Sequence, residues 1–282
     1  MKANKTKIVF FGTPELAVWA LEEMQSAGII PDLIVTTPDK PAGRGRILTS
    51  PPVKLWADEN NIPVLQPEKL DENFASYLPK DSLFCVFAYG KILPQNILDI
   101  PEFGTLNIHP SLLPKLRGPS PIRTAILKDM KNEIGVSIIL LDEKMDHGPI
   151  VAQEKIEITE WPIMGKILDE QLARSGGKLL ASTIPDWLAG NIKVKEQDHD
   201  NVTFSKKFEK ENALINMEDD DYQNYLKICA YDGWPGAYFF KDGKRLKITA
   251  AHIEGTKLII DRVIPEGKKE MEYIPNPSLA YS

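Results

Sequence analysis

Short, continuous apolar runs alternate with helix-like patterns in the amino-terminal half of the chain. Strand-like runs cover residues 7–11, 33–37 and 82–87, and apolar residues at helical spacing follow the first run between residues 16 and 24. Continuous apolar runs are typical of strands that are buried on both faces of a parallel sheet. Because helices alternate with these strands and crossovers are right-handed, the pattern predicts a Rossmann-like α/β fold with a doubly wound, mostly parallel sheet.

The first strand leads through Gly12 into the first predicted helix. Thr13 is a good N-cap, Pro14 suits the first helical position, and Glu15 complements the helix dipole. Gly12 is the one glycine of this turn, so the GxGxxG pattern of dinucleotide-binding proteins is missing, and GxxxxGK[ST] occurs nowhere in the sequence. The sequence therefore favours neither dinucleotide binding nor P-loop phosphate chemistry.

Two more strands and a long helix complete the first predicted domain. Residues 104–109 and 135–141 are strand-like, and the apolar spacing of residues 167–188 predicts a helix that closes the domain. We expect a catalytic domain over residues 1–190.

A polar stretch separates this domain from a smaller one. Residues 191–205 are predicted to be a linker, and residues 206–282 a small, β-rich domain. Within that domain, residues 206–229 have a helical pattern, and residues 244–251 and 257–264 read as a pair of strands.

Composition and charge restrict the class of protein. The 282 residues carry a net charge of −6 and only two cysteines, which lack CxxC spacing. This suits a reducing cytoplasm. The apolar run at residues 8–11 is too short for a signal peptide, and no stretch is long enough to span a membrane, so we expect a cytoplasmic protein. Four basic residues and one acidic residue nevertheless occur within residues 39–54.

This basic segment includes Arg44 and Arg46. It contains two glycines and a proline within residues 39–46, and we interpret it as a mobile loop. One interpretation is a solvated surface that aids solubility. The other is an arm that binds phosphate groups, because arginine forms bidentate hydrogen bonds with phosphate.

Asn107 and His109 are the first candidate catalytic residues. Residues i and i+2 of a strand point to the same face, and these two end a predicted strand, at the edge where open α/β sheets bind ligands. An amide donor beside an imidazole can stabilise an oxyanion, and histidine can transfer protons near neutral pH. A strand end that is simply capped by two polar side chains remains the alternative.

Asp146 lies in an acidic loop after the strand at residues 135–141. Most acidic side chains in loops are solvated. If the two strands are neighbours, however, the Asp146 carboxylate can orient His109. The four histidines of the chain have no metal-ligand spacing, so we expect no metal site.

Several motifs together resemble the methionyl-tRNA formyltransferase family. The similarity extends over residues 5–205 and weakly on to residues 234–235. The motifs are Phe11-Gly-Thr-Pro14, Asp39-Lys-Pro-Ala-Gly-Arg-Gly45, Val86-Phe-Ala-Tyr-Gly90, Asn107-Ile-His-Pro-Ser-Leu-Leu-Pro114 with Arg117-Gly118, and Met145-Asp-His-Gly-Pro149. The resemblance implies transfer of a formyl group from 10-formyltetrahydrofolate to the α-amino group of methionyl initiator tRNA, with no metal.

The resemblance also implies roles for individual residues. Asn107 and His109 would stabilise the oxyanion, and Asp146 would orient His109 and assist proton transfer. The residues implied for folate binding are Phe87, Tyr89, Gly90, Leu93, Ser111, Leu112, Leu113 and Pro114. Those implied for tRNA contact are Arg44 and, more weakly, Lys40 and Arg46.

Two features depart from the family pattern. His147 occupies a position next to Asp146 where the family often has a smaller or polar residue. The carboxyl-terminal domain, which resembles an OB-fold in the family, has little length left after Trp234, so we expect a reduced sheet. Residues 206–282 carry 12 basic and 13 acidic side chains, which indicates no broad charge for binding tRNA.

Two alternatives stay open. An N-formyltransferase that acts on an amino-sugar nucleotide would share the Asn107, His109 and Asp146 set but would not need the basic segment. A non-catalytic folate- or RNA-binding relative would bind without turnover, and the intact set argues against it. We expect a monomer whose partners are folate and initiator methionyl-tRNA.

Overall fold

The computed structural model describes residues 6–42 and 45–274, and these form two compact units. Unit 1 comprises Met1–Gly118, Ile134–Ile156 and Asp169–Phe204. Unit 2 comprises Pro119–Glu133, Glu157–Leu168 and Ser205–Ser282. Two segments that interrupt unit 1 in the sequence therefore belong to unit 2. None of the helices in the described part of the chain has the length and apolar character needed to cross a membrane.

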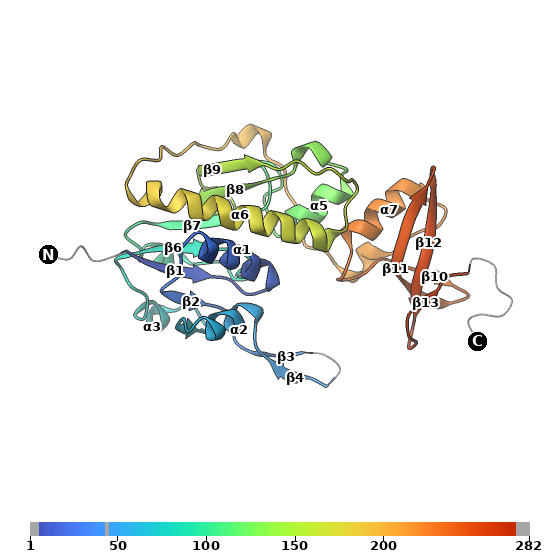
Figure 1. Cartoon of the computed structure of the whole chain (residues 1–282), viewed down its shortest axis with the longest axis horizontal. Coiled ribbons are helices and arrows are strands. Elements are labelled where there is room, and N and C mark those ends of the chain that lie inside the picture. Colours follow the sequence, from blue (N-terminus) through green and yellow to red (C-terminus); the bar gives the residue numbers. More distant parts are fainter. Residues whose placement is uncertain (1–5, 43–44, 275–282) are drawn as a thin grey trace. The chain divides into compact units, whose positions relative to one another are not determined.

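Unit 1 is built on a seven-stranded sheet (Figure 1). Its strands, in spatial order, are β5 (Val64–Leu65), β2 (Leu33–Val35), β1 (Lys7–Phe11), β6 (Ser82–Val86), β7 (Thr105–His109), β8 (Gly135–Leu140) and β9 (Ile150–Lys155). The first five are parallel, whereas β8 is antiparallel to β7 and β9 is antiparallel to β8. The predicted doubly wound, mostly parallel sheet is thus confirmed.

Helices cover both faces of this sheet. They are α1 (Glu15–Ser26), α2 (Pro52–Glu59), α3 (Glu72–Ala75), α4 (Gln95–Leu98) and α6 (Gly165–Leu188), whose first turn is assigned to unit 2. Alternate residues of β1 separate into two cores: Ile8 and Phe10 pack with α1, α2 and α6, and Val9 and Phe11 pack with α3 and α4. This alternation is the period of two of a strand with both faces buried.

Helix α6 packs directly on the strand that carries the candidate residues. A Cβ atom on Gly176 would lie 2.5 Å from a methyl carbon of Ile108, so glycine permits this close approach. Ile108 therefore belongs to the core under α1 and α6. Its neighbours Asn107 and His109 point to the other face of the sheet.

The turn between β1 and α1 differs from the prediction. The helix begins at Glu15 with Pro14 as N-cap, and Thr13 does not cap it. The Thr13 hydroxyl instead donates to the carbonyl of Tyr89 at 2.9 Å. A tertiary hydrogen bond to the loop after β6 has replaced the local cap, so the predicted N-cap was wrong.

The basic segment is a β-hairpin in its described part. Strands β3 (Lys40–Ala42) and β4 (Ile47–Thr49) pair antiparallel, so the prediction of a mobile loop was wrong for these residues. Ladder hydrogen bonds between the two short strands replace the flexible coil that the glycines suggested. Arg44 lies outside the described residues.

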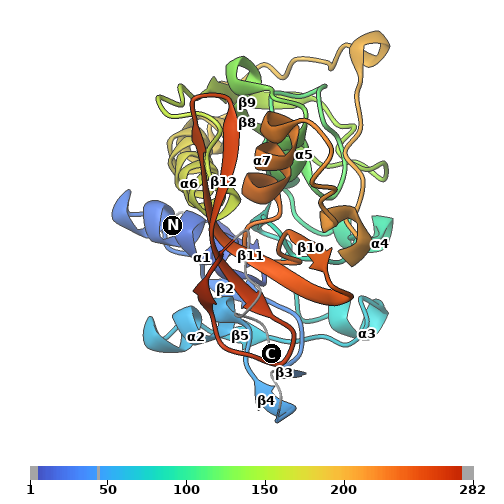
Figure 2. The ribbon, with the colours of Figure 1, turned by 90° about the vertical axis from the view of Figure 1, so that its right-hand side faces the viewer.

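Unit 2 contains a second, smaller sheet, visible in Figure 2. Its strands are β10 (Tyr238–Lys241), β11 (Lys244–Glu254), β12 (Lys257–Pro265) and β13 (Met271–Glu272), in that order and antiparallel. The predicted small carboxyl-terminal sheet is confirmed. One of its faces covers a core that includes Phe239, Leu246 and Val263.

The helical prediction for residues 206–229 was only partly right. The described chain forms short 3-10 turns at Lys131–Glu133, His199–Asn201 and Lys210–Ala213, and α-helices α5 (Pro121–Leu127) and α7 (Asp221–Ala230). Helix α7 starts only at Asp221, well after the predicted start at residue 206. The Asp220 carboxylate caps the helix by accepting a hydrogen bond from the backbone N–H of Gln223 at 2.9 Å. A run of acidic residues favours a helix amino terminus over a helix interior.

Candidate active site

The candidate site is built on the last residues of β7. Asn107 and His109 project from the face of the sheet opposite Ile108, and in neighbouring strands Asn107 pairs with Val86 and Ile139. His109 is only 4% exposed. The side-chain amide of Asn107 is partly buried and has no hydrogen-bond partner among residues 6–42 and 45–274. That amide is therefore available to a substrate.

His109 is oriented through both of its ring nitrogens. Nε2 lies 3.0 Å from the carbonyl oxygen of Leu116, and because a carbonyl only accepts, Nε2 carries a hydrogen. Nδ1 faces a carboxylate oxygen of Asp146 at 3.5 Å. Nδ1 is thus the ring nitrogen that Leu116 leaves available, and it faces the Asp146 carboxylate.

Asp146 reaches His109 from an unexpected direction. Because β8 is antiparallel to β7, Leu140 pairs with Leu106, and the loop that follows β8 begins near the amino-terminal half of β7. The loop then returns to His109, at the far end of that strand. Asp146 has a left-handed backbone (φ 50°), and its second carboxylate oxygen accepts the Gly118 amide at 2.7 Å.

Gln197 and Arg117 surround the backbone of Asp146. The Gln197 amide nitrogen donates to the carbonyls of Asp146 at 2.9 Å and Gly148 at 2.7 Å. Arg117 donates to the Gln197 side-chain oxygen through Nε at 3.1 Å and a terminal nitrogen at 2.7 Å. Burial lowers the pKa of Arg117, while the charges of Asp146 and Asp142 act in the opposite direction.

Two histidines complete this cluster. The His147 and His199 rings are stacked, with centroids 4.4 Å apart and planes 10° from parallel. His147 Nδ1 lies 2.6 Å from an Asp142 carboxylate oxygen, and His199 Nδ1 accepts a hydrogen bond from Arg117 at 2.9 Å. His147, the residue that departs from the family pattern, therefore joins the Asp146 loop to the segment that carries Gln197.

The residues implied for folate binding divide into core and loop positions. Phe87 is buried in the core under α1 and α6, and Tyr89 and Leu93 are buried in the core under α3 and α4. Burial raises the pKa of Tyr89 to about 12, and its buried hydroxyl has no partner among the described residues. Gly90 has a positive φ of 82°, which glycine adopts without strain.

The loop that includes Ser111, Leu112, Leu113 and Pro114 is held by a serine from β8. The Ser137 hydroxyl, fully buried, donates to the Ser111 carbonyl at 2.7 Å and accepts the Leu113 amide at 3.1 Å. Gln153 donates to the Leu113 carbonyl and to the same hydroxyl. Leu113 is buried, while Leu112 and Pro114 are partly exposed. Side chains of β8 and β9 thus fix the loop conformation, while part of the apolar surface of the loop stays accessible.

The residues implied for tRNA contact lie apart from β7 in the sequence. Lys40 and Arg46 are exposed on the β3–β4 hairpin. At the base of the hairpin, Asp39 accepts hydrogen bonds from Gln66 at 2.7 Å and Lys54 at 3.0 Å. These contacts lower the pKa of Asp39, Gln66 contributing most, and attach the hairpin to unit 1.

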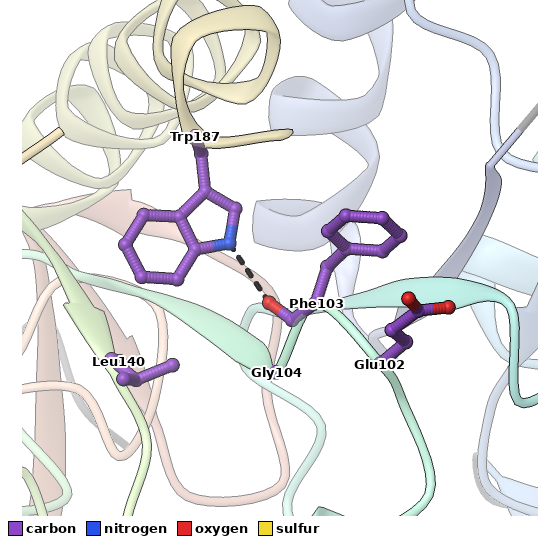
Figure 3. A pocket seen from close by; sticks show the side chains of 5 residues that line it. All are labelled: Glu102, Phe103, Gly104, Leu140 and Trp187. Carbon is purple, nitrogen blue, oxygen red and sulfur yellow. Dashed lines mark hydrogen bonds between the residues drawn. The ribbon is translucent and has the colours of Figure 1, made fainter. Parts of the chain in front are cut away.

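A cavity of about 350 Å³ lies at the opposite end of β7 (Figure 3). It is lined by Glu102, Phe103, Gly104, Leu140 and Trp187. Gly104 precedes the first residue of β7, whereas His109 is the last, so this cavity is separate from the candidate site. Among residues 6–42 and 45–274, no group of three or more His, Cys, Asp or Glu side chains is arranged to hold a metal ion.

Comparison with known families decides the class of this chain. A family model described as "Formyl transferase" matches residues 6–184, and one described as "Formyl transferase, C-terminal domain" matches residues 207–258. The chain belongs to the formyl transferase family. The Asn107 strand and the Asp146 loop both lie inside the first matched region.

Individual members of the formyl transferase family are also similar to the chain. A methionyl-tRNA formyltransferase of Chloroflexus aurantiacus is 43% identical over 252 residues, which cover 88% of this chain and 80% of the relative. The structure of methionyl-tRNA formyltransferase from Clostridium thermocellum matches with a TM-score of 0.61 at 17% identity, over 95% of this chain and 100% of that one. An N-formyltransferase of Helicobacter canadensis, solved with folinic acid and dTDP-3-aminofucose, matches with a TM-score of 0.64 at 17% identity, over 91% of this chain and 95% of that one.

Proposed function

We propose that this protein transfers a formyl group from 10-formyltetrahydrofolate to the α-amino group of methionyl initiator tRNA and so supports translation initiation. The observation that carries the proposal is the unpartnered amide of Asn107 on the same strand face as His109, with Asp146 opposite His109 Nδ1 at 3.5 Å. Its curated relatives with 36–43% identity are methionyl-tRNA formyltransferases.

The three side chains suit the requirements of the reaction. When the amine nitrogen bonds to the formyl carbon, negative charge collects on the formyl oxygen, and the Asn107 amide can donate a hydrogen bond to it. The attacking nitrogen must lose a proton. His109 Nδ1 and Asp146 form the proton-accepting pair, and the folate nitrogen takes up a proton as its bond to the formyl carbon breaks. Leu116 fixes the tautomer that this role requires.

The folate binds, in this proposal, against the loop after β6 and the loop after β7. Because Phe87, Tyr89 and Leu93 are buried in the cores, their part is to shape the first loop, and its backbone makes the contacts. In the second loop, Leu112 and Pro114 offer accessible apolar surface, and Ser137 preorganises the backbone between Ser111 and Leu113. A folate fits such a site because its flat ring system can pack on the apolar surface while its polar edge forms hydrogen bonds with backbone groups.

The outer face of the small sheet supports a nucleic-acid substrate. Tyr238 and Phe240 of β10 pair with Lys247 and Arg245 of β11, so these four side chains share the face opposite the unit 2 core. Phe240 is 59% exposed, and the Arg245 guanidinium lies 5.3 Å from the centre of the Tyr238 ring. Exposed aromatic rings beside basic groups are suited to stacking with bases and binding phosphates. Residues 206–282 as a whole carry no excess of positive charge, so in this proposal the tRNA contact of unit 2 is made by this local face.

The same features favour tRNA over an amino-sugar nucleotide. A small nucleotide sugar needs neither the β3–β4 hairpin with Lys40 and Arg46 nor the aromatic face of unit 2. The structural similarity to the Helicobacter canadensis enzyme, at 17% identity, concerns the fold alone. We further propose that the protein is a cytoplasmic monomer and that its reaction requires no metal ion.

The decisive experiment is a formylation assay with the intact chain. The protein and 10-formyltetrahydrofolate are incubated with one acceptor in each of three parallel reactions. The acceptors are methionyl initiator tRNA, methionyl elongator tRNA and an amino-sugar nucleotide. We expect formyl-methionine on the initiator tRNA and none on the sugar. Formylation of the sugar alone, or of no acceptor at high enzyme concentration, contradicts the proposal.

A further inference from the structure

The loop that carries Asp146 has no regular secondary structure to fix its path. Residues 141–149 contain no helix or strand, and residues 143–145 are exposed. Asp146 itself has a φ of 50°, in the left-handed region that few non-glycine residues adopt, although aspartate adopts it more readily than most. Residues from elsewhere in unit 1 contact Asp146 directly: the Gly118 amide donates to its carboxylate, and Gln197 donates to its backbone carbonyl.

Gln197 contacts this loop from a distant part of the sequence. It is only 5% exposed, and its amide nitrogen donates to the carbonyls of Asp146 and Gly148, on the two sides of His147. Two donated hydrogen bonds use both hydrogens of the amide. The backbone on each side of the turn is thus attached to one buried group.

Arg117 fixes which way the Gln197 amide points. Its two hydrogen bonds to the Gln197 oxygen, at 3.1 Å and 2.7 Å, leave the nitrogen directed at the Asp146 loop. In the reversed orientation, the amide oxygen would face two carbonyl oxygens and its nitrogen would face a guanidinium. Neither of these two contacts pairs a donor with an acceptor, so the observed orientation of the Gln197 amide is strongly favoured.

The segment around Gln197 also supports His109. Lys195 exchanges two backbone hydrogen bonds with Ile150 of β9, at 2.7 Å and 2.8 Å, which anchors the segment to the sheet. Further along, the Thr203 hydroxyl accepts the amide of Leu116 at 2.9 Å. Leu116 is the residue whose carbonyl holds His109 Nε2. Residues 195–203 therefore connect to both members of the His109–Asp146 pair.

We propose that Gln197 is a positioning residue of the transfer reaction, which sets the Asp146 carboxylate opposite Nδ1 of His109. The proposal rests on the proposed function. Gln197 takes no part in proton transfer and acts only through the backbone of Asp146 and Gly148. A displacement of a catalytic group by about 1 Å can cost on the order of 100-fold in rate, so loss of this support lowers turnover without removing a substrate contact.

The test compares Gln197→Ala with a matched control, Asn224→Ala. Asn224 is also a buried amide, 1% exposed, and donates to a loop carbonyl, that of Asn216, at 2.8 Å in unit 2. We expect Gln197→Ala to lower kcat about 10-fold or more, with the KM for tRNA and for folate nearly unchanged. Asn224→Ala lowers the melting temperature and leaves kcat close to that of the unsubstituted protein.

A double-mutant cycle separates positioning from general destabilisation. In an Asp146→Asn background the backbone carbonyl is kept but the carboxylate is gone, so adding Gln197→Ala has no further effect on the single-turnover rate if Gln197 acts through that carboxylate. Additive losses overturn the proposal. So does an unchanged kcat in Gln197→Ala.

A second variant guards against loss of folding. Gln197→Glu keeps an oxygen for Arg117 but has no N–H to donate to the two carbonyls, so we expect a folded protein with the same loss of kcat. Normal kcat in this variant contradicts the proposal. If the unsubstituted protein forms no formyl-methionine, the proposed function itself fails, whereas activity that Gln197 substitutions do not change defeats only the positioning role.

Discussion

Nδ1 of His109 faces a carboxylate oxygen of Asp146 at 3.5 Å, although His109 ends β7 and Asp146 lies in the loop after β8, which starts near the other end of β7. The 3.5 Å separation leaves the pair able to tighten when charge develops during the reaction. Both residues are also held by the loop after β7, through Leu116 and Gly118. The geometry of this pair is therefore set by three segments of unit 1.

Asn107→Ala tests the oxyanion role of the free amide. Because this amide has no partner in the described chain, its removal breaks no hydrogen bond of the fold, and thermal stability stays nearly unchanged. We expect kcat to fall about 10²-fold or more, as when an oxyanion donor is lost. Single-turnover formylation measures this effect. An unchanged rate would show that Asn107 does not contact the reacting oxygen.

Ser137→Ala tests the support of the proposed folate loop. Its loss leaves the Ser111 carbonyl and the Leu113 amide without their partner, which costs about 1–3 kcal/mol for buried groups, and loosens the loop. We expect weaker folate binding in an equilibrium titration and a lower midpoint of urea unfolding.

The matched control for this prediction is Ser82→Ala. Ser82 is also fully buried in the sheet, and its hydroxyl donates to the Pro79 carbonyl at 2.5 Å, before β6. This variant should lose stability but keep its folate affinity. Equal folate affinity in both variants would exclude a role of Ser137 in shaping the binding loop.

Phe240→Ala tests the aromatic face of the small sheet. Phe240 is 59% exposed, so its truncation should change stability little. Stacking on an aromatic side chain contributes about 1–3 kcal/mol per base, so we expect the KM for tRNA to rise about 5-fold or more while the folate KM is unchanged. Tyr77, 63% exposed in unit 1, provides the control, and Tyr77→Ala should leave both constants unaltered. Equal KM values in the two variants would remove this face from the tRNA contact.

Buried thiols predict a loss of stability at alkaline pH. Burial raises the pKa of Cys85 and of Cys229 from an ordinary 9.0 to about 12. Above pH 9 the unfolded chain loses these protons while the folded chain keeps them, so the free energy of unfolding falls as pH rises from about 9 towards 12. Urea unfolding at pH 8, 9 and 10 measures the trend. Stability that rises over this range would contradict the burial of both thiols.

The mostly parallel sheet could be predicted from the sequence because its cause is local. A run such as residues 82–87 is apolar at every position, and only a strand covered on both faces buries all of it. The shared face of Asn107 and His109 follows from the same period of two. Strand geometry alone thus determined that an amide and an imidazole would lie together.

Local patterns failed where a tertiary contact competed with them. Thr13 has the chemistry of a helix cap, but its hydroxyl binds the Tyr89 carbonyl instead. The glycines after Lys40 suggested a flexible loop, yet β3 and β4 pair, and Asp39 anchors their base through Gln66 and Lys54. In each case a hydrogen bond to a residue distant in sequence decided the conformation.

The sequence by itself determined the central strands β1, β2, β6, β7 and β8, the identity of the chemical groups and their order along β7. Only the tertiary structure decided that Asp146 returns to His109 and that Gln197 fixes the loop in between. Nothing in the local pattern around Gln197 distinguishes it from a solvated glutamine, because its partners are backbone carbonyls, which every residue carries. Hydrogen bonds to backbone groups leave no signature in side-chain chemistry, so they become visible only when the chain is folded.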